Sequence, residues 1–432
     1  MNHRGPLQKP WRSGAAEPAG HLHVPQAPAR PGESPDFSYL SLDPAGAIDR
    51  FPVDIAARDT TNTSRHLVRV LDDEGAAVGP WAPALQRAEL LQGLWYMRLT
   101  RLMDERLLKA QRQGKITFYV PSTGEEAVAV GQAMALLPGD MLFPSYRNQG
   151  MHLARGRSAV ELMCQCLSNS RDMCKGRQLP VMYHWREGNI FSVSGNLATQ
   201  LPQAVGWAMA ANIKGESHIA AAWTGEGATA EADFHHALTF AAVYQAPVIL
   251  NVVNNQWAIS SSQGLAGGES GTFAARGPGY GVAGLRVDGN DLLALYAVTQ
   301  WAAERARRGF GPTLIESVTY RAGPHSSSDD PTRYRPREEA ASFPLGDPIE
   351  RLSRHLAHSF GWTAAEDAQQ QSRAVAEIEQ CWQEALRAGA LSDGPRPDPQ
   401  SLFDDVFAST TAQLERQRRL LAQLSPPAGT SS

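Results

Sequence analysis

The chain has 432 residues, of which 42% are hydrophobic and 19% are charged, so most of it can build a buried core. Its formal net charge of −4 excludes the strongly basic surface of nucleic-acid-binding proteins, and we expect no nucleic-acid partner. No apolar run approaches the roughly 18 residues that a membrane-spanning helix needs, so we expect no membrane association.

Residues 1–84 form an N-terminal arm in our interpretation, because residues 1–55 hold nine of the 29 prolines and favour extended backbone. Such an arm is either disordered or anchored on a partner surface by four apolar residues, Phe37, Tyr39, Leu40 and Leu42. No apolar segment of a secretory signal follows Met1, and the acidic residues of the arm argue against a mitochondrial presequence. These features favour the bacterial cytoplasm over the mitochondrial matrix.

The globular part of the chain begins near residue 85. Apolar residues at helical spacing predict a long amphipathic helix over 85–113, which Gly114 stops. A second helix is expected to follow residues 124–126 and to end near Gly139, and residues 141–200 are rich in loop-forming residues. A further helix is predicted over 201–213.

The chain has four cysteines, which are Cys164, Cys166, Cys174 and Cys381. Their spacing matches no zinc site, and a disulfide framework is implausible in a chain of this size. We therefore expect free thiols in a reducing compartment.

The clearest architectural signal is a strand, a turn, a helix and a strand in succession. Residues 218–223 and 247–253 are short apolar runs, and a Gly-rich turn at 225–227 and a helical segment at 230–244 lie between them. Two strands joined by a helix indicate a parallel sheet with a crossover connection. A further strand is predicted over 314–320.

These elements predict an α/β fold class, with a parallel sheet flanked by helices over residues 85–345. Residues 346–432 form a helical C-terminal region and a frayed tail, with helices expected over 349–360, 366–388 and 410–424.

The turn after the first of these strands permits two interpretations. The run Gly225-Glu226-Gly227-Ala228-Thr229-Ala230 matches the G-x-G-x-x-A pattern of dinucleotide-binding sites. That pattern needs an acidic residue at the end of the next strand to hold a ribose, and this position carries Val253-Asn254-Asn255-Gln256. The dinucleotide interpretation therefore lacks its second contact.

The second interpretation is a magnesium-diphosphate site. The Gly-Glu-Gly turn is followed by 26 residues and then by Asn254-Asn255. A carboxylate and an amide at the ends of neighbouring parallel strands lie side by side and supply the oxygen ligands that Mg²⁺ prefers. Glycines at the turn let backbone N–H groups approach a diphosphate. A turn and an asparagine corner on a plain α/β sheet are the alternative.

The same spacing resembles the thiamin diphosphate signature, and the resemblance extends over residues 85–425. There the chain resembles the α subunit of the decarboxylating component of 2-oxo acid dehydrogenase complexes, and most closely the branched-chain type. The matching segments begin at Gln111, Gly124, Ser145, Lys175, Leu197, Gly225, Asn254 and Tyr320. The stretch Lys175-Gly-Arg-Gln-Leu-Pro favours the branched-chain type over the pyruvate type.

The resemblance implies thiamin diphosphate and Mg²⁺ as cofactors, and K⁺ as a further ion. The implied Mg²⁺ ligands are the side chains of Glu226 and Asn255 and the carbonyl of Trp257. The implied cofactor contacts are Tyr146, Arg147, Gly195, Leu197, Glu226, Gly227, Ala228, Asn255 and His325. Of these, Tyr146 and Leu197 would also face the substrate. The implied K⁺ loop contains Ser194, Asn196, Thr199 and Gln200.

His325 is the only catalytic candidate among the 12 histidines. The resemblance implies that it lies near the diphosphate and the reacting carbon, where an imidazole can stabilise an intermediate or assist acyl transfer. The alternatives are a solvated loop histidine for His325 and a surface ion pair for Arg147.

The chain departs from the family pattern at two positions. Ser145 stands where some members have Gln, and Val253 stands where some have Arg, so cofactor affinity is in question. Ser326 matches the serine that a dedicated kinase modifies in mitochondrial members, and Asp329-Asp330 is an alternative means of ordering the same loop.

The implied activity is decarboxylation of a branched-chain 2-oxo acid with transfer of the acyl group to a lipoyl group on a partner acyltransferase core. In this family the glutamate that activates the cofactor belongs to a β subunit, and the expected assembly is an α2β2 heterotetramer. The alternatives are a pyruvate or acetoin dehydrogenase α subunit and a non-catalytic scaffold of the same fold.

Overall fold

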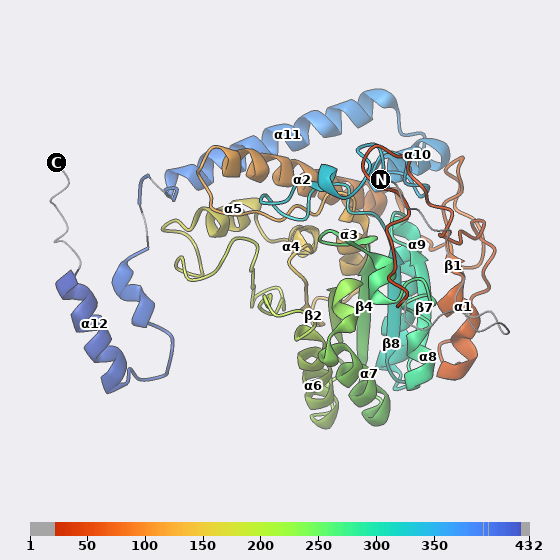
Figure 1. The fold of residues 1–432 in the computed structure, drawn as a ribbon, viewed down its shortest axis with the longest axis horizontal. Helices are drawn as coiled ribbons and strands as arrows, with labels where there is room; N and C mark the ends of the chain where they lie inside the picture. Colours follow the sequence, from red (N-terminus) through yellow and green to blue (C-terminus); the bar gives the residue numbers. More distant parts are fainter. Residues whose placement is uncertain (1–21, 392, 396, 425–432) are drawn as a thin grey trace.

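A computed structural model describes residues 22–391, 393–395 and 397–424. Within them, a six-stranded sheet has the order β1-β7-β8-β4-β3-β2, and every neighbouring pair is parallel (Figure 1). The strands are β1 (Leu67–Val68), β2 (Met141–Phe143), β3 (Ala220–Gly225), β4 (Val248–Asn254), β7 (Ala283–Asp288) and β8 (Thr313–Val318). The parallel α/β sheet predicted from the sequence is confirmed.

The central strands are buried on both faces, as parallel strands covered by helices are. On one face, Trp223 and Ile249 pack in a core with α3 (Glu126–Ala135) and α9 (Leu292–Arg307). On the other face, Ala222 and Leu250 pack with α6 (Gln200–Ile213) and α7 (Ala232–Tyr244). Alternate residues of each strand thus serve opposite cores, which explains the continuous apolar runs in the sequence.

The predicted long helix is α2 (Arg87–Arg112), and Gly114 follows it at a φ of 71°. Its start is fixed by a capping box between Gln86 and Glu89. The predicted C-terminal helices are α10 (Pro348–Phe360), α11 (Ala364–Arg387) and α12 (Ala412–Leu424).

Residues 141–200 are mostly loop, as expected, but they also contain three elements that the sequence did not indicate, β2, α4 (Gln149–Ala154) and α5 (Ala159–Leu167). These elements are short, and short apolar segments carry too little periodicity to be identified from sequence. Residues next to α5 cap both of its ends. The Ser158 side chain accepts a hydrogen bond from the Val160 N–H at the start, and Ser168 ends the helix in a left-handed conformation.

The remaining elements are short. The helices are α1 (Thr61–Arg65) and α8 (Arg276–Tyr280), and the strands β5 (Trp257–Ala258) and β6 (Ser261–Ser262) form a hairpin. The 3-10 turns are η1 (Ala57–Thr60), η2 (Gly227–Ala230), η3 (Gln263–Ala266), η4 (Pro331–Arg333) and η5 (Pro399–Phe403).

The described part of the N-terminal arm folds back on the chain itself. Phe37 packs edge-on against Tyr320 and Phe343, with ring centroids 5.9 and 5.4 Å apart. Tyr39 donates a hydrogen bond to Gln256 Oε1 over 3.1 Å. The apolar residues expected to seek a partner surface therefore contact this chain's own sheet layer, and β1 of the arm forms an edge of the sheet.

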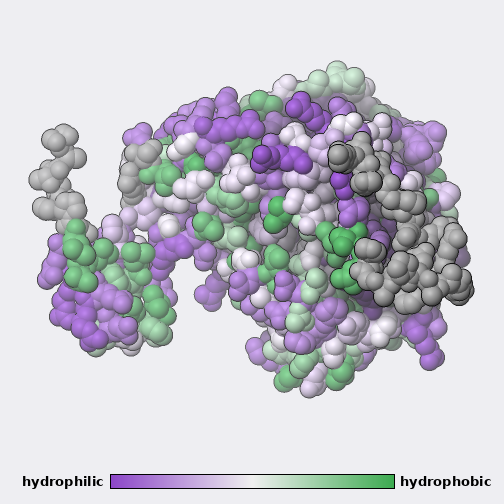
Figure 2. Space-filling model, viewed as in Figure 1, coloured by the Kyte–Doolittle hydropathy of each residue, from purple (hydrophilic) through white to green (hydrophobic). Residues whose placement is uncertain are grey.

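The C-terminal region has two parts. α10 and α11 pack along α2, whereas α12 lies away from the main body (Figure 1). No residue of α12 is buried, and apolar and charged side chains share its surface (Figure 2). Ion pairs of Asp404 and Asp405 with Lys175, and of Asp404 with Arg418, hold the segment before α12. The predicted tail falls on residues 425–432, outside the described residues.

The four cysteines are free thiols, three buried and Cys381 half-buried. Among the described residues, no helix combines the length and apolar character needed to cross a lipid bilayer.

Candidate active site

A cavity of about 370 Å³ opens at the carboxyl ends of β3 and β4. Its wall includes every residue that the sequence implied as a cofactor contact: Tyr146, Arg147, Gly195, Leu197, Glu226, Gly227, Ala228, Asn255 and His325. Trp257, Ser194, Asn196 and Gln200 also line it, whereas Thr199 lines a neighbouring open hollow. The fold thus brings together segments from five separate parts of the chain.

The register between β3 and β4 determines where the two implied side-chain ligands of the metal lie. β3 and β4 are neighbours, and Gly225 pairs with Val253 at their ends. Glu226 and Asn255 follow these strands directly, and the Asn255 N–H lies 3.4 Å from Glu226 Oε2. The predicted adjacency of these two residues at the strand ends is confirmed.

The Glu226 carboxylate is buried, with 1% of the residue exposed. Burial, reinforced by the nearby Glu125 carboxylate, raises its pKa to about 7. Its Oε1 has no hydrogen-bond partner among the described residues. A buried, unpartnered carboxylate oxygen is costly, and a bound cation would satisfy it.

Asn255 and Trp257 supply the other oxygens. Asn255 Oδ1 accepts from the Trp257 N–H over 3.2 Å, and its Nδ2 donates to Glu125 Oε1 over 2.7 Å. The Trp257 carbonyl accepts from Arg321 Nη1 over 3.0 Å and keeps a second lone pair. No group of three or more His, Cys, Asp or Glu able to hold a metal occurs among the described residues. A Mg²⁺ ion here would therefore depend on amide, carbonyl and phosphate oxygens besides one carboxylate.

The turn between β3 and α7 needs a glycine at one position. A Cβ added to Gly227 would lie 2.4 Å from the Ala258 Cβ, whereas one added to Gly225 would meet open space. Gly227 begins η2 and lines the cavity, so its missing side chain leaves room at the backbone. Such a cradle suits a diphosphate.

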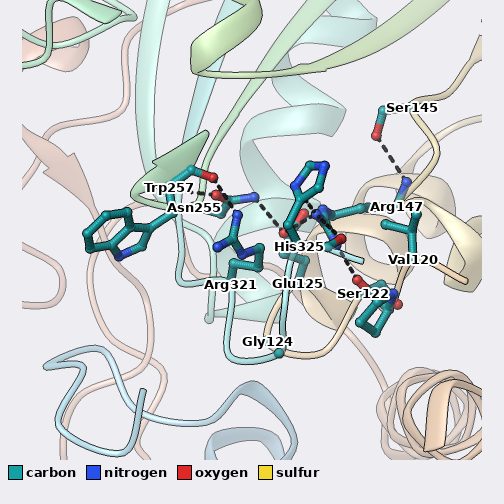
Figure 3. A network of polar contacts seen from close by, with 12 residues as sticks. Val120, Ser122, Gly124, Glu125, Ser145, Arg147, Asn255, Trp257, Arg321 and His325 are labelled. Carbon is teal, nitrogen blue, oxygen red and sulfur yellow. Dashed lines mark hydrogen bonds and ion pairs between the residues drawn. The ribbon is translucent and has the colours of Figure 1, made fainter. Parts of the chain in front are cut away.

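The buried Arg147 and the half-buried His325 form a hydrogen-bonded pair in the wall of the cavity (Figure 3). Arg147 is 5% exposed and its Nη2 donates to His325 Nδ1 over 2.9 Å and to the His325 carbonyl over 2.8 Å. Arg147 is therefore not the surface ion pair considered as its alternative.

The hydrogen bond from Arg147 also determines which nitrogen of the neutral His325 imidazole carries the proton. Because a guanidinium only donates, Nδ1 accepts and the proton of the neutral ring lies on Nε2. Burial, with the charges of Arg147 and Arg321, lowers the pKa of His325 to about 3. Asp329 accepts from the His325 backbone N–H over 2.7 Å, so this acidic residue orders the loop. His325 is a positioned, neutral imidazole.

The implied K⁺ loop is closed by its own hydrogen bonds. The Asn196 N–H donates to Ser194 Oγ over 3.1 Å, and Thr199 Oγ1 donates to the Asn196 carbonyl over 3.0 Å. Gln200 Nε2 donates to the Trp223 carbonyl over 2.6 Å, and its Oε1 is buried without a partner among the described residues.

The departures from the family pattern leave no charge at their positions. Val253 is buried in the cavity wall, and Ser145 Oγ donates to Asn148 Oδ1 over 3.0 Å. Ser326 is buried, and its Oγ accepts from the Ser328 N–H over 3.3 Å.

Sequence reasoning assigned no role to two residues of the site, Glu125 and Arg321. Both lie in segments that carry the resemblance, but their contacts join chain positions far apart; Glu125 and Asn255 are 130 positions apart. Burial raises the pKa of Glu125, while Arg147 and Asn255 oppose that shift. The sequence signal that could have identified Glu125 is the pair of acidic residues at 125 and 126, at the start of a helix that carries no other charge.

Comparisons with known proteins show which family the chain belongs to. A family model described as "Dehydrogenase E1 component" matches residues 95–392, and one described as "2-oxoisovalerate dehydrogenase E1 alpha subunit N terminal" matches residues 18–58. The 2-oxoisovalerate dehydrogenase subunit alpha of Pseudomonas aeruginosa is 56% identical over 400 residues, which are 93% of this chain and 98% of that protein. The mitochondrial 2-oxoisovalerate dehydrogenase subunit alpha of Homo sapiens is 38% identical over 359 residues, 83% of this chain and 79% of that protein. The chain therefore belongs to the dehydrogenase E1 component family, within its group of 2-oxoisovalerate dehydrogenase alpha subunits.

Proposed function

We propose that this chain is the α subunit of a thiamin diphosphate-dependent branched-chain 2-oxo acid dehydrogenase, which decarboxylates the acid and passes the acyl group to a lipoyl group. The observation that carries the proposal is the unpartnered, buried carboxylate oxygen of Glu226 beside Asn255, in a cavity that Arg147 and His325 also line. A non-catalytic scaffold has no need of this costly arrangement.

The residues present fit the cofactor. Glu226, Asn255 and the Trp257 carbonyl would hold Mg²⁺, and the Arg147 guanidinium with the backbone at Gly227 and Ala228 would hold the diphosphate. The backbone at Gly195 and Leu197 would orient the aminopyrimidine ring, and Tyr146 and Leu197 would contact the substrate. Thiamin diphosphate supplies an electron sink for the loss of carbon dioxide when it is bound.

His325 is proposed as the catalytic residue of this chain. Arg147 holds its Nδ1, so Nε2–H remains as the donor that the neutral ring can offer to a substrate oxygen. Because the pKa of His325 lies at about 3, the ring keeps this form throughout the physiological pH range.

The loop of Ser194, Asn196, Thr199 and Gln200 is proposed as a K⁺ site, which would order the backbone at Gly195 and Leu197. The unpartnered Gln200 Oε1 supports this proposal, because amide and carbonyl oxygens suit an alkali cation. Replacing K⁺ with Li⁺ in the buffer should then lower affinity for thiamin diphosphate.

The proposed partners are a β subunit, in an α2β2 heterotetramer, and a lipoyl-bearing acyltransferase core. Two exposed apolar residues that line the cavity support a partner at this surface, since Leu197 is 49% exposed and Ile259 is 54% exposed.

The proposed domain division of the chain is an arm (1–84), an α/β domain (85–345) and a helical C-terminal region (346–432). The proposed location is the bacterial cytoplasm, in keeping with the Pseudomonas aeruginosa relative.

Decarboxylation by this chain co-purified with its β subunit tests the proposal. With thiamin diphosphate and Mg²⁺, we expect 3-methyl-2-oxobutanoate to be preferred over pyruvate, and Glu226→Ala to abolish the activity. A preference for pyruvate would contradict the branched-chain assignment and keep the mechanism. Failure of the wild-type complex to bind thiamin diphosphate would support the scaffold.

A further inference from the structure

We propose that Glu125 is a positioning residue that turns the Asn255 amide so that its oxygen faces the magnesium site; this inference rests on the proposed function. Glu125 is the N-cap residue of α3 and is 4% exposed, and Asn255 follows β4. Asn255 Nδ2 donates to Glu125 Oε1 over 2.7 Å, within the polar network of Figure 3.

The contact matters because an asparagine amide has two unlike ends. Its oxygen can bind a cation, whereas its NH2 group can only donate. A carboxylate accepts hydrogen bonds and donates none when ionised, so Glu125 selects the NH2 end. On the opposite side of the amide, the Trp257 N–H donates to Asn255 Oδ1 over 3.2 Å, so it requires the oxygen at that end. Both contacts define one orientation, and rotating the amide by half a turn would break both.

Glu125 also approaches the residue proposed to hold the diphosphate. Its Oε1 lies 3.8 Å from Arg147 Nε, and Arg147 in turn donates to His325. One buried carboxylate therefore contacts a proposed metal ligand and a proposed diphosphate ligand. Partners of this kind around a metal site set ligand orientation, and losing one costs about 10- to 100-fold in metal affinity.

A competing account is that Glu125 acts only through its negative charge near the cation. The two accounts differ in what they require of the side chain. Orientation of Asn255 requires an acceptor that reaches its Nδ2, and charge alone does not. Glu125→Gln keeps the length and an acceptor and removes the charge, whereas Glu125→Asp keeps the charge and is one methylene too short.

The chain offers a matched control one residue away. Asn254 Nδ2 donates to Glu316 Oε1 over 2.9 Å, and Glu316 is 1% exposed. This pair is also a buried glutamate holding an asparagine, but neither member lines the cavity. Glu316→Gln therefore reports the general cost of neutralising a buried glutamate.

The experiment uses the complex of this chain with its β subunit. Calorimetric titration with thiamin diphosphate at a series of Mg²⁺ concentrations gives the apparent dissociation constant for Mg²⁺, and thermal unfolding reports whether each variant is folded. We expect Glu125→Asp to weaken Mg²⁺ binding about tenfold or more, and Glu125→Gln and Glu316→Gln to stay within about threefold of the wild type.

The inference is overturned if Glu125→Asp binds Mg²⁺ as the wild type does. It is also overturned if Glu125→Gln loses as much affinity as Glu125→Asp, because charge would then explain both. Absence of Mg²⁺-dependent binding in the wild-type complex would instead overturn the proposed function, and the inference with it. Equal affinities of wild type and variants, with binding intact, count against the inference alone.

Discussion

At the scale of single residues, the tightest steric requirement in the site is at Gly227. A Cβ at this position would meet the Ala258 Cβ at 2.4 Å, so Gly227→Ala forces the β3 turn and the β5 strand apart. We expect a loss of about 1–3 kcal/mol in the free energy of unfolding, typical of overpacking, together with weaker thiamin diphosphate binding. Urea unfolding and calorimetry measure the two effects.

The partner in this clash provides the control. Ala258→Gly removes the opposing methyl group, so the double variant Gly227→Ala/Ala258→Gly should regain most of the cofactor affinity. A single Gly227→Ala variant with unchanged stability and unchanged affinity would contradict the steric argument.

His325 predicts a pH dependence of folding. Its pKa is about 3 in the folded chain against an ordinary value of 6.5. Between these values the unfolded chain binds a proton that the folded chain does not, so this residue costs stability as pH falls below about 6.5. His325→Gln cannot titrate, and its free energy of unfolding should fall less between pH 7 and pH 5 than that of the wild type. Urea unfolding at both pH values tests this, and an equal fall in both proteins would refute it.

Spacing predicted one part of the candidate site, and the family resemblance implied the other candidate residues that line the cavity. Spacing alone placed Glu226 next to Asn255, since strand ends meet at one edge of a parallel sheet. The spacing of motifs could not predict the Glu125–Asn255 and Arg147–His325 hydrogen bonds. Each of these bonds joins segments that only tertiary folding brings together.

At the scale of elements, the arm is secured by a few aromatic contacts. Phe37 is half-buried against Tyr320 and Phe343, so Phe37→Ala should cost about 1–2 kcal/mol in the free energy of unfolding, less than a fully buried phenylalanine. Leu22→Ala is the control on the same arm, because Leu22 is 93% exposed. Equal stabilities of the two variants in urea unfolding would show that the arm adds nothing to the fold.

Element lengths explain which parts of the fold were predictable. α2, α6, α7 and α11 have many turns of consistent pattern, and their predicted spans agree with the structure to within a few residues. α4 and α5 are short and lie in a segment rich in turns, so their pattern is weak. The arm's contacts with its own chain were missed because proline content predicts extension and says nothing about which surface the arm meets.

At the scale of the whole molecule, the proposed assembly predicts what this chain can do without its β subunit. The exposed Leu197 and Ile259 line the cavity, and the proposed activating glutamate belongs to the β subunit. We therefore expect the purified chain alone to decarboxylate neither 3-methyl-2-oxobutanoate nor pyruvate, and activity to appear on adding the β subunit. Carbon dioxide release measured with each preparation decides this. Full activity of the chain alone would contradict the proposed assembly.

The pairing of Gly225 with Val253 has a consequence for how cofactor binding should respond to distant change. Glu226 and Asn255 are fixed to interior strands that helices cover on both faces, so their separation is set by backbone hydrogen bonds rather than by loops. Such a site is preorganised, and little conformational entropy is lost when a cation enters it. Core substitutions that shift one strand along the other should thus be detected first as impaired cofactor loading, before any loss of fold.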